Sequence, residues 1–106
     1  MVRYLSLLLF IGLALGQSEL DPNDALVYYN QGNVYYDLGR YTKAIESYKK
    51  SIALDPDNAD AYNNLGNAYK NQGKLTQAIE SYEKAIELDP NDASAYNNLG
   101  VLYHTR

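Results

Sequence analysis

The feature that most constrains this chain is a repeat of 34 residues. The string Ala-Tyr-Asn-Asn-Leu-Gly at residues 61–66 returns unchanged at residues 95–100, and the tripeptide Leu-Asp-Pro that begins at Leu20, Leu54 and Leu88 keeps the same interval. A fixed period of this length marks a stack of identical supersecondary units. The sequence therefore predicts a repeat array, with its function on the surface of the stack and not in a catalytic cluster.

Each repeat is expected to form two antiparallel helices. Gly39 and Gly73 end the first helix, because glycine tolerates positive φ, and an Asp or Asn just after each Pro can cap a helix start. A second helix is expected over residues 42–54 and 76–88, before Pro56 and Pro90, which cannot continue a helix. We predict an all-α solenoid of helical hairpins. Its units are repeat one over 25–58, repeat two over 59–92, and the first helix of an incomplete third repeat over 93–106.

Aromatic and small residues recur in these helices at helical spacing. Tyrosines are expected to fill the wider gaps between helices, whereas glycines and alanines stand where two helices approach closely. The packing residues predicted in this way include Tyr28, Gly32, Tyr35, Ala44, Ile45, Tyr48, Tyr62, Leu65, Gly66, Tyr69, Ala78, Ile79, Tyr82, Tyr96, Leu99 and Gly100.

The pattern of the second repeat resembles the tetratricopeptide repeat (TPR). It reads Tyr62-x-x-Leu65-Gly66-x-x-Tyr69-x-x-x-Gly73, followed by Ala78, Tyr82, Ala85 and Pro90. The resemblance covers residues 20–106 and implies a right-handed superhelix of helix pairs. It also implies that the first helix of each pair lines a concave groove, where members of the family bind peptide segments or partner proteins.

The groove positions implied by the resemblance are rich in asparagine. An amide offers both a donor and an acceptor, so the column Asn30, Asn64 and Asn98 can hydrogen-bond the backbone of an extended peptide. This column resembles the asparagine ladder in the repeat region of O-linked N-acetylglucosamine transferases. In the alternative interpretation, these asparagines only face a neighbouring helix. The candidate peptide-binding residues are Tyr29, Asn30, Asn33, Asn63, Asn64, Asn67, Asn97 and Asn98, and Tyr36 and Asp37 also fall at groove positions.

A second binding mode of the family clamps the C-terminal carboxylate of a partner between basic residues and asparagines. Asn33 and Asn64 match the asparagines of that clamp. Tyr29, Ser94 and Asn98, however, stand where its basic residues would be. An anionic ligand end would meet no compensating charge there, so we do not expect this mode.

Charge and residue content argue against several other functions. The net charge is −4, and the basic residues are scattered along the sequence, so no stripe for nucleic acid is evident. The chain has one histidine, His104, and no cysteine, which leaves little material for nucleophilic catalysis or transition-metal binding. We therefore expect no enzymatic activity and no cofactor or metal.

The N-terminal segment has the character of a secretory signal. Arg3 precedes a nearly unbroken apolar run over residues 4–15, and Ala14-Leu15-Gly16 has the small residues that signal peptidase requires. The run is too short to span a hydrocarbon core of about 30 Å. We expect a cleaved signal over 1–16 and a secreted, periplasmic or extracellular protein, with residues 17–24 as a linker and the remnant of a preceding repeat. A retained apolar helix against the first repeat and an uncleaved membrane anchor are the alternatives.

Three functional interpretations follow from this organisation. The leading one is a scaffold that binds a protein or an extended peptide in its asparagine-rich groove. The second is a structural fragment of a longer array that self-associates, because an unfinished third repeat would leave an apolar face around Leu99 and Leu102 partly uncovered. The third is the non-catalytic repeat part of a glycosyltransferase-like enzyme.

Overall fold

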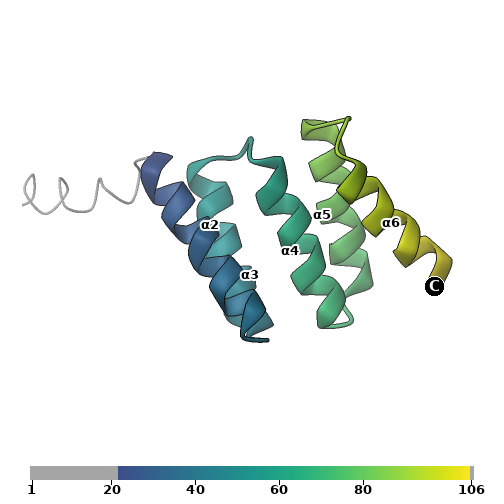
Figure 1. The fold of residues 1–106 in the computed structure, drawn as a ribbon, viewed down its shortest axis with the longest axis horizontal. Helices are drawn as coiled ribbons and strands as arrows, with labels where there is room; N and C mark the ends of the chain where they lie inside the picture. Colours follow the sequence, from purple (N-terminus) through teal and green to yellow (C-terminus); the bar gives the residue numbers. More distant parts are fainter. Residues whose placement is uncertain (1–21, 106) are drawn as a thin grey trace, which may run out of the picture.

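The computed structural model describes residues 22–105, which form helices joined by short turns (Figure 1). The helices are α2 (Pro22–Asp37), α3 (Tyr41–Leu54), α4 (Ala59–Asn71), α5 (Leu75–Leu88) and α6 (Ala93–Thr105). The expected signal segment over 1–16 lies outside the described residues, and α2 begins at Pro22, inside the segment 17–24. Within the described part of the chain, no helix is both long and apolar enough to cross a membrane.

Local sequence signals fix the helix boundaries. The side chain of Asn58 accepts a hydrogen bond from the Ala61 amide at 3.1 Å and so caps α4. Asp92 caps α6 by accepting from the Ser94 amide at 2.9 Å. Gly39 and Gly73, which follow α2 and α4, both have φ of 76°. The predicted second helices are confirmed, each with one more residue at its start.

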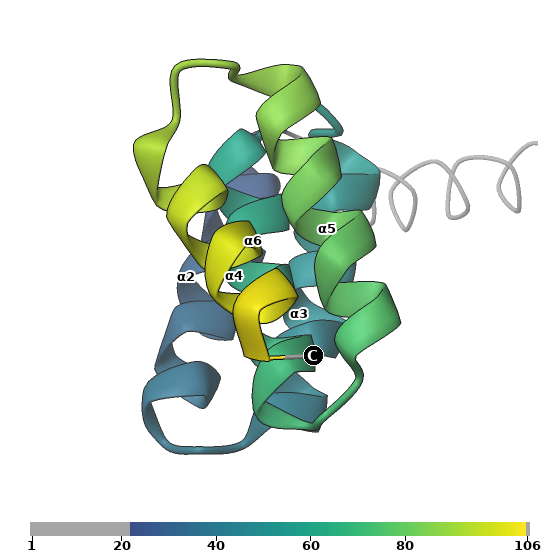
Figure 2. The ribbon, with the colours of Figure 1, turned by 90° about the vertical axis from the view of Figure 1, so that its right-hand side faces the viewer.

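The helices form two layers of a solenoid. Hairpin α2–α3 packs against hairpin α4–α5 through α3 and α4, and α6 packs against α5. Figures 1 and 2 show α2, α4 and α6 in one layer and α3 and α5 in the other. The first helices of successive repeats therefore present one common face, as the fold prediction required.

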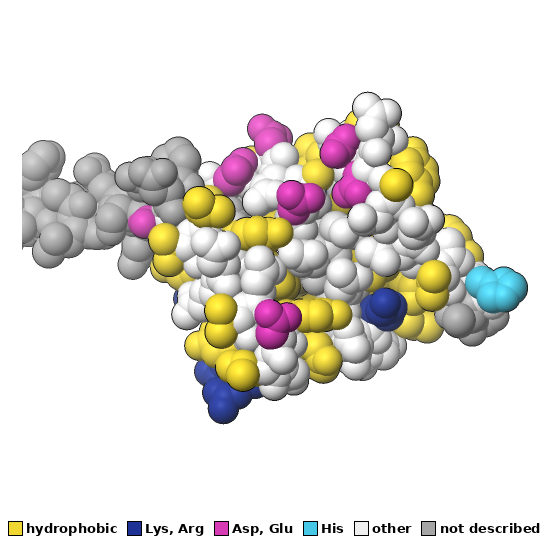
Figure 3. All heavy atoms as spheres, viewed as in Figure 1, with side chains coloured by type: hydrophobic (Ala, Val, Ile, Leu, Met, Phe, Trp, Pro, Cys, Tyr) yellow, Lys and Arg dark blue, Asp and Glu magenta, His cyan; other side chains and the backbone are white. Residues whose placement is uncertain are grey.

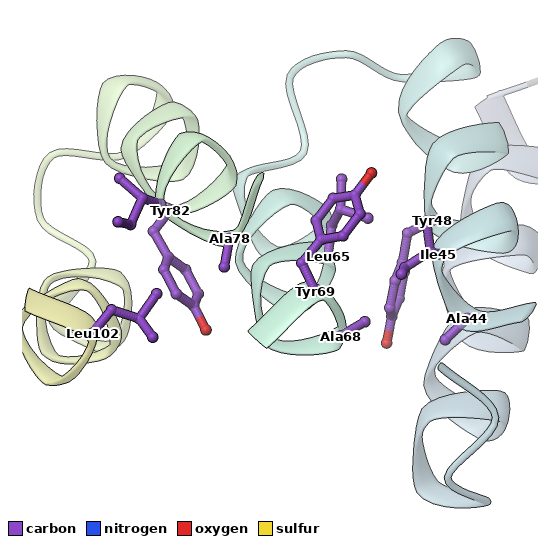
Figure 4. Packing of buried hydrophobic residues seen from close by; sticks show 10 residues of the cluster. Ala44, Ile45, Tyr48, Leu65, Ala68, Tyr69, Ala78, Tyr82 and Leu102 are labelled. Carbon is purple, nitrogen blue, oxygen red and sulfur yellow. The ribbon is translucent and has the colours of Figure 1, made fainter. Parts of the chain in front are cut away.

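Tyrosine rings seated on glycines hold each hairpin together. An added Cβ on Gly32 would lie 2.6 Å from the ring of Tyr48, and one on Gly66 would lie 2.6 Å from the ring of Tyr82. Both tyrosines are fully buried, and the ring of Tyr82 also packs near Leu102 of α6 (Figure 4). The predicted packing role of these residues is confirmed, because only a residue without a Cβ lets the ring approach so closely.

The third repeat differs from the first two in this respect. No atom lies within 4 Å of the position that a Cβ on Gly100 would occupy. Tyr96, Val101 and Tyr103 each expose about half of their surface on α6, so the packing role predicted for Tyr96 and Gly100 is wrong. Leu102, which was expected to be partly uncovered, is buried. One side of α6 is therefore packed, and the other remains open among the described residues.

Candidate peptide-binding pocket between the first two repeats

A pocket of about 350 Å³ opens between α2 and α4, and we call it the α2–α4 pocket. Its lining comes from α2, α3 and α4 and consists of Asn33, Tyr36, Asp37, Tyr48, Asn64 and Asn67. The face formed by α2, α4 and α6 is largely uncharged polar surface between apolar patches (Figure 3). Residues three apart on a helix share one face, and this is why Asn33 and Tyr36 of α2, like Asn64 and Asn67 of α4, line the pocket together.

Hydrogen bonds fix the orientation of the amides in this pocket. Oδ1 of Asn33 accepts from the hydroxyl of Tyr48 at 2.6 Å and from Nδ2 of Asn64 at 3.0 Å. Nδ2 of Asn64 also donates to the hydroxyl oxygen of Tyr29 at 3.1 Å. In the second repeat, the hydroxyl of Tyr82 donates to Oδ1 of Asn67. Each of these amides is therefore anchored through one of its two ends.

The anchoring determines which end of each amide is left for a ligand. Both Nδ2 hydrogens of Asn64 are used, so its Oδ1 remains as an acceptor. The oxygens of Asn33 and Asn67 are used, so the Nδ2 groups of these two residues remain as donors. No hydrogen bond from residues 22–105 occupies these three remaining groups. The pocket thus presents a donor, an acceptor and a donor in fixed orientations.

The structure brings only part of the predicted site together. Asn33, Asn64 and Asn67 line the pocket, and Tyr29 lies beside it through its bond to Asn64. Asn63 is instead buried and accepts from Nδ2 of Asn98 at 3.0 Å, a bond that joins α6 to α4. The remaining two candidates, Asn30 and Asn97, are exposed outside the pocket. Asn64 and Asn98 of the predicted column therefore also join neighbouring repeats, which is the role that the alternative interpretation gave them.

Only a packing role was predicted for Tyr48 from the sequence, but its hydroxyl also lines the pocket. A signal for this role was present, since Tyr48 and Tyr82 occupy the same position in successive repeats and each has an asparagine within reach. Burial raises the pKa of both tyrosines well above the ordinary value of about 10. The two hydroxyls therefore stay protonated near neutral pH and act as permanent donors to the asparagines.

The stacked hairpins and their shared face define a helical repeat protein of the solenoid class. The model of the family described as "TPR repeat" matches residues 32–73 and again 66–105. The chain belongs to this family. No curated protein matches the sequence.

Solved TPR structures share the fold. The match to the crystal structure of MamA has 35% sequence identity and a TM-score of 0.77, and it covers 80% of this chain and 50% of the MamA chain. The first TPR of Spaghetti (RPAP3) bound to the HSP90 peptide SRMEEVD has 28% sequence identity and a TM-score of 0.76, and the match covers 80% of this chain and 68% of that chain. The second TPR domain of human RPAP3 in complex with the HSP70 peptide SGPTIEEVD is 26% identical, with a TM-score of 0.72 and coverage of 74% and 66%. This chain thus spans half the length of MamA, and its fold is one that other proteins use to hold peptides.

Proposed function

We propose that this chain is a non-catalytic scaffold that binds an extended peptide across the α2–α4 pocket. The observation that carries the proposal is the fixed series of a free donor on Asn33, a free acceptor on Asn64 and a free donor on Asn67. An extended peptide offers carbonyl oxygens and amide hydrogens in alternation, so it can match such a series whatever its side chains are. The TPR structures with bound peptides support this use of the fold.

A pair of isosteric substitutions tests the proposal. In Asn33→Asp with Asn67→Asp, each side chain keeps the oxygen that accepts from a tyrosine hydroxyl but loses the donor that faces the pocket. The probe is a capped, uncharged heptapeptide of alternating serine and alanine, titrated into the ¹⁵N-labelled full chain. Losing two hydrogen bonds of about 1 kcal/mol each should weaken binding about 30-fold.

The matched control is Asn91→Asp, which makes the same chemical change on an exposed residue in the turn between α5 and α6. This variant should bind the heptapeptide like the unaltered chain. Circular dichroism should show the same helicity for all variants. If millimolar heptapeptide leaves the side-chain amide signals of Asn33, Asn64 and Asn67 unmoved, recognition of a peptide backbone in this pocket is wrong.

Self-association is a second candidate function, and the open side of α6 favours it. Tyr96 and Tyr103 are about half exposed there, and the surface over Gly100 lacks the tyrosine ring that covers Gly32 and Gly66. A second copy of the chain, packing its own α6 against this side, would bury both tyrosines in a two-fold contact.

Light scattering of the full chain distinguishes this candidate from a monomeric scaffold. A dimer is expected if α6 is the contact, and Tyr103→Lys should return the mass to 11.9 kDa, because two lysines would then face each other. The control Val27→Lys places the same charge on an exposed apolar residue of α2. A monomer for the unaltered chain, or a dimer that survives Tyr103→Lys, contradicts the α6 contact.

A further inference from the structure

The charge in the α2–α4 pocket has one sign. Of the six residues that line it, Asp37 alone is charged, and no lysine or arginine is among them. Asp37 is exposed, and the ion pair found among the described residues, Lys84 with Glu87, lies elsewhere on α5. The carboxylate of Asp37 therefore faces the pocket without a partner cation from residues 22–105.

Two tyrosine rings form the aromatic part of the same pocket. Lys43, Lys49 and Lys50 lie over rings of other tyrosines, with Nζ 5.4–5.8 Å from the ring centroids. Within the described part of the chain, the half-buried ring of Tyr36 receives no such cation, whereas the ring of Tyr48 is buried against Gly32 and Tyr29 and has no face open to a ligand. The ring of Tyr36, which packs against Tyr41 in a T-shaped contact, is thus the pocket ring on which an ammonium or guanidinium group can bind.

The electrostatic interactions inside the pocket also favour a positive charge there. Burial is the main cause of the raised pKa of Tyr48, and the neighbours Tyr29, Tyr36 and Asp37 raise it further. The negative charge of Asp37 disfavours a second negative charge in the pocket, and by the same interaction it favours a positive one. Acidic side chains are also more prominent than basic ones on this face (Figure 3), and the net charge of the chain is −4.

We infer that the α2–α4 pocket receives the lysine or arginine side chain of a bound peptide, with the cation at Asp37 and its stem against Tyr36. This inference rests on the proposed function, because the asparagines must first hold the peptide backbone across the pocket. The volume of about 350 Å³ is at the lower end for ligand pockets, so it suits one long side chain. The groove would therefore select cationic peptides, whereas the peptides SRMEEVD and SGPTIEEVD bound by RPAP3 end in acidic residues.

The test varies one residue of the probe. The heptapeptide host carries arginine, lysine, citrulline or glutamate at its central position, and its affinity for the full chain is measured by NMR titration in low salt. Citrulline has nearly the shape of arginine without its charge. We expect the arginine and lysine peptides to bind about tenfold more tightly than the citrulline peptide, and the glutamate peptide to bind most weakly.

The matched variants are Asp37→Asn and Glu80→Gln, which remove the same charge from the pocket and from an exposed position of α5. Asp37→Asn should remove most of the difference in affinity between the arginine and citrulline peptides, whereas Glu80→Gln should leave their ratio unchanged. Equal binding of all four peptides by the unaltered chain overturns the cation inference but leaves backbone recognition standing. If no peptide binds, the proposed function fails and the inference fails with it.

Discussion

Gly66→Ala is expected to lower the free energy of unfolding by about 1–3 kcal/mol, the usual cost of overpacking a core. The added methyl would lie 2.6 Å from Cε1 and 2.7 Å from Cδ1 of Tyr82. Tyr82 has no exposed surface, so its ring cannot move away without disturbing α4, α5 and α6 together. The loss should exceed the gain of up to about 1 kcal/mol that alanine brings over glycine inside a helix. Urea denaturation followed by circular dichroism measures the difference.

The third repeat supplies the control for this substitution. Gly100 has the same place in its repeat as Gly66, but a Cβ there would meet nothing within 4 Å. Gly100→Ala should therefore leave stability unchanged or raise it by up to about 1 kcal/mol. If the two variants behave alike, the seating of Tyr82 on Gly66 does not matter for stability.

Tyr82→Ala is expected to be more damaging, at about 3–5 kcal/mol, as for other large aromatic residues removed from a core. The substitution removes the ring that covers Gly66 and packs near Leu102, and it also leaves Oδ1 of Asn67 without its donor. A domain of this size has roughly 5–15 kcal/mol of stability in total. Most of the cooperative thermal transition seen by circular dichroism should therefore be lost.

Two further tyrosine variants separate the parts of this effect. Tyr82→Phe keeps the ring but removes the hydroxyl, and should cost about 1–2 kcal/mol through the unpaired Asn67 oxygen. Tyr96→Ala removes a half-exposed ring from α6 and should change stability by less than about 1 kcal/mol. A Tyr82→Ala protein that melts like Tyr96→Ala would contradict the central place given to Tyr82 in the core.

The helices were predictable because the signals that set them are local. Gly39 and Gly73 end helices through their own backbone freedom, and Asn58 caps α4 with its own side chain. The seating of the Tyr82 ring on Gly66 was not predicted. The helical spacing of the two residues did predict that both pack between helices. The predicted features depend on residue type and period, both of which the sequence displays directly.

The site was predictable only in outline. Helix register indicated that asparagines share a face, but it could not determine which end of an amide another residue would occupy. That depends on the distance and rotation between helices, which place Asn64 within reach of Asn33 and Tyr29 and bury Asn63 against Asn98. The role of the Tyr48 hydroxyl could not be predicted for the same reason. A tyrosine that only packs and a tyrosine that also lines the pocket would occupy the same position in the repeat.

Side-chain hydrogen bonds between the described repeats run in one sense along the array. Asn64 donates back to Asn33, Asn71 donates back to Tyr36, and Asn98 donates back to Asn63. Each repeat therefore presents amide donors toward the preceding repeat and oxygen acceptors toward the following one. This polarity gives the array a chemical direction, which the 34-residue period by itself does not reveal.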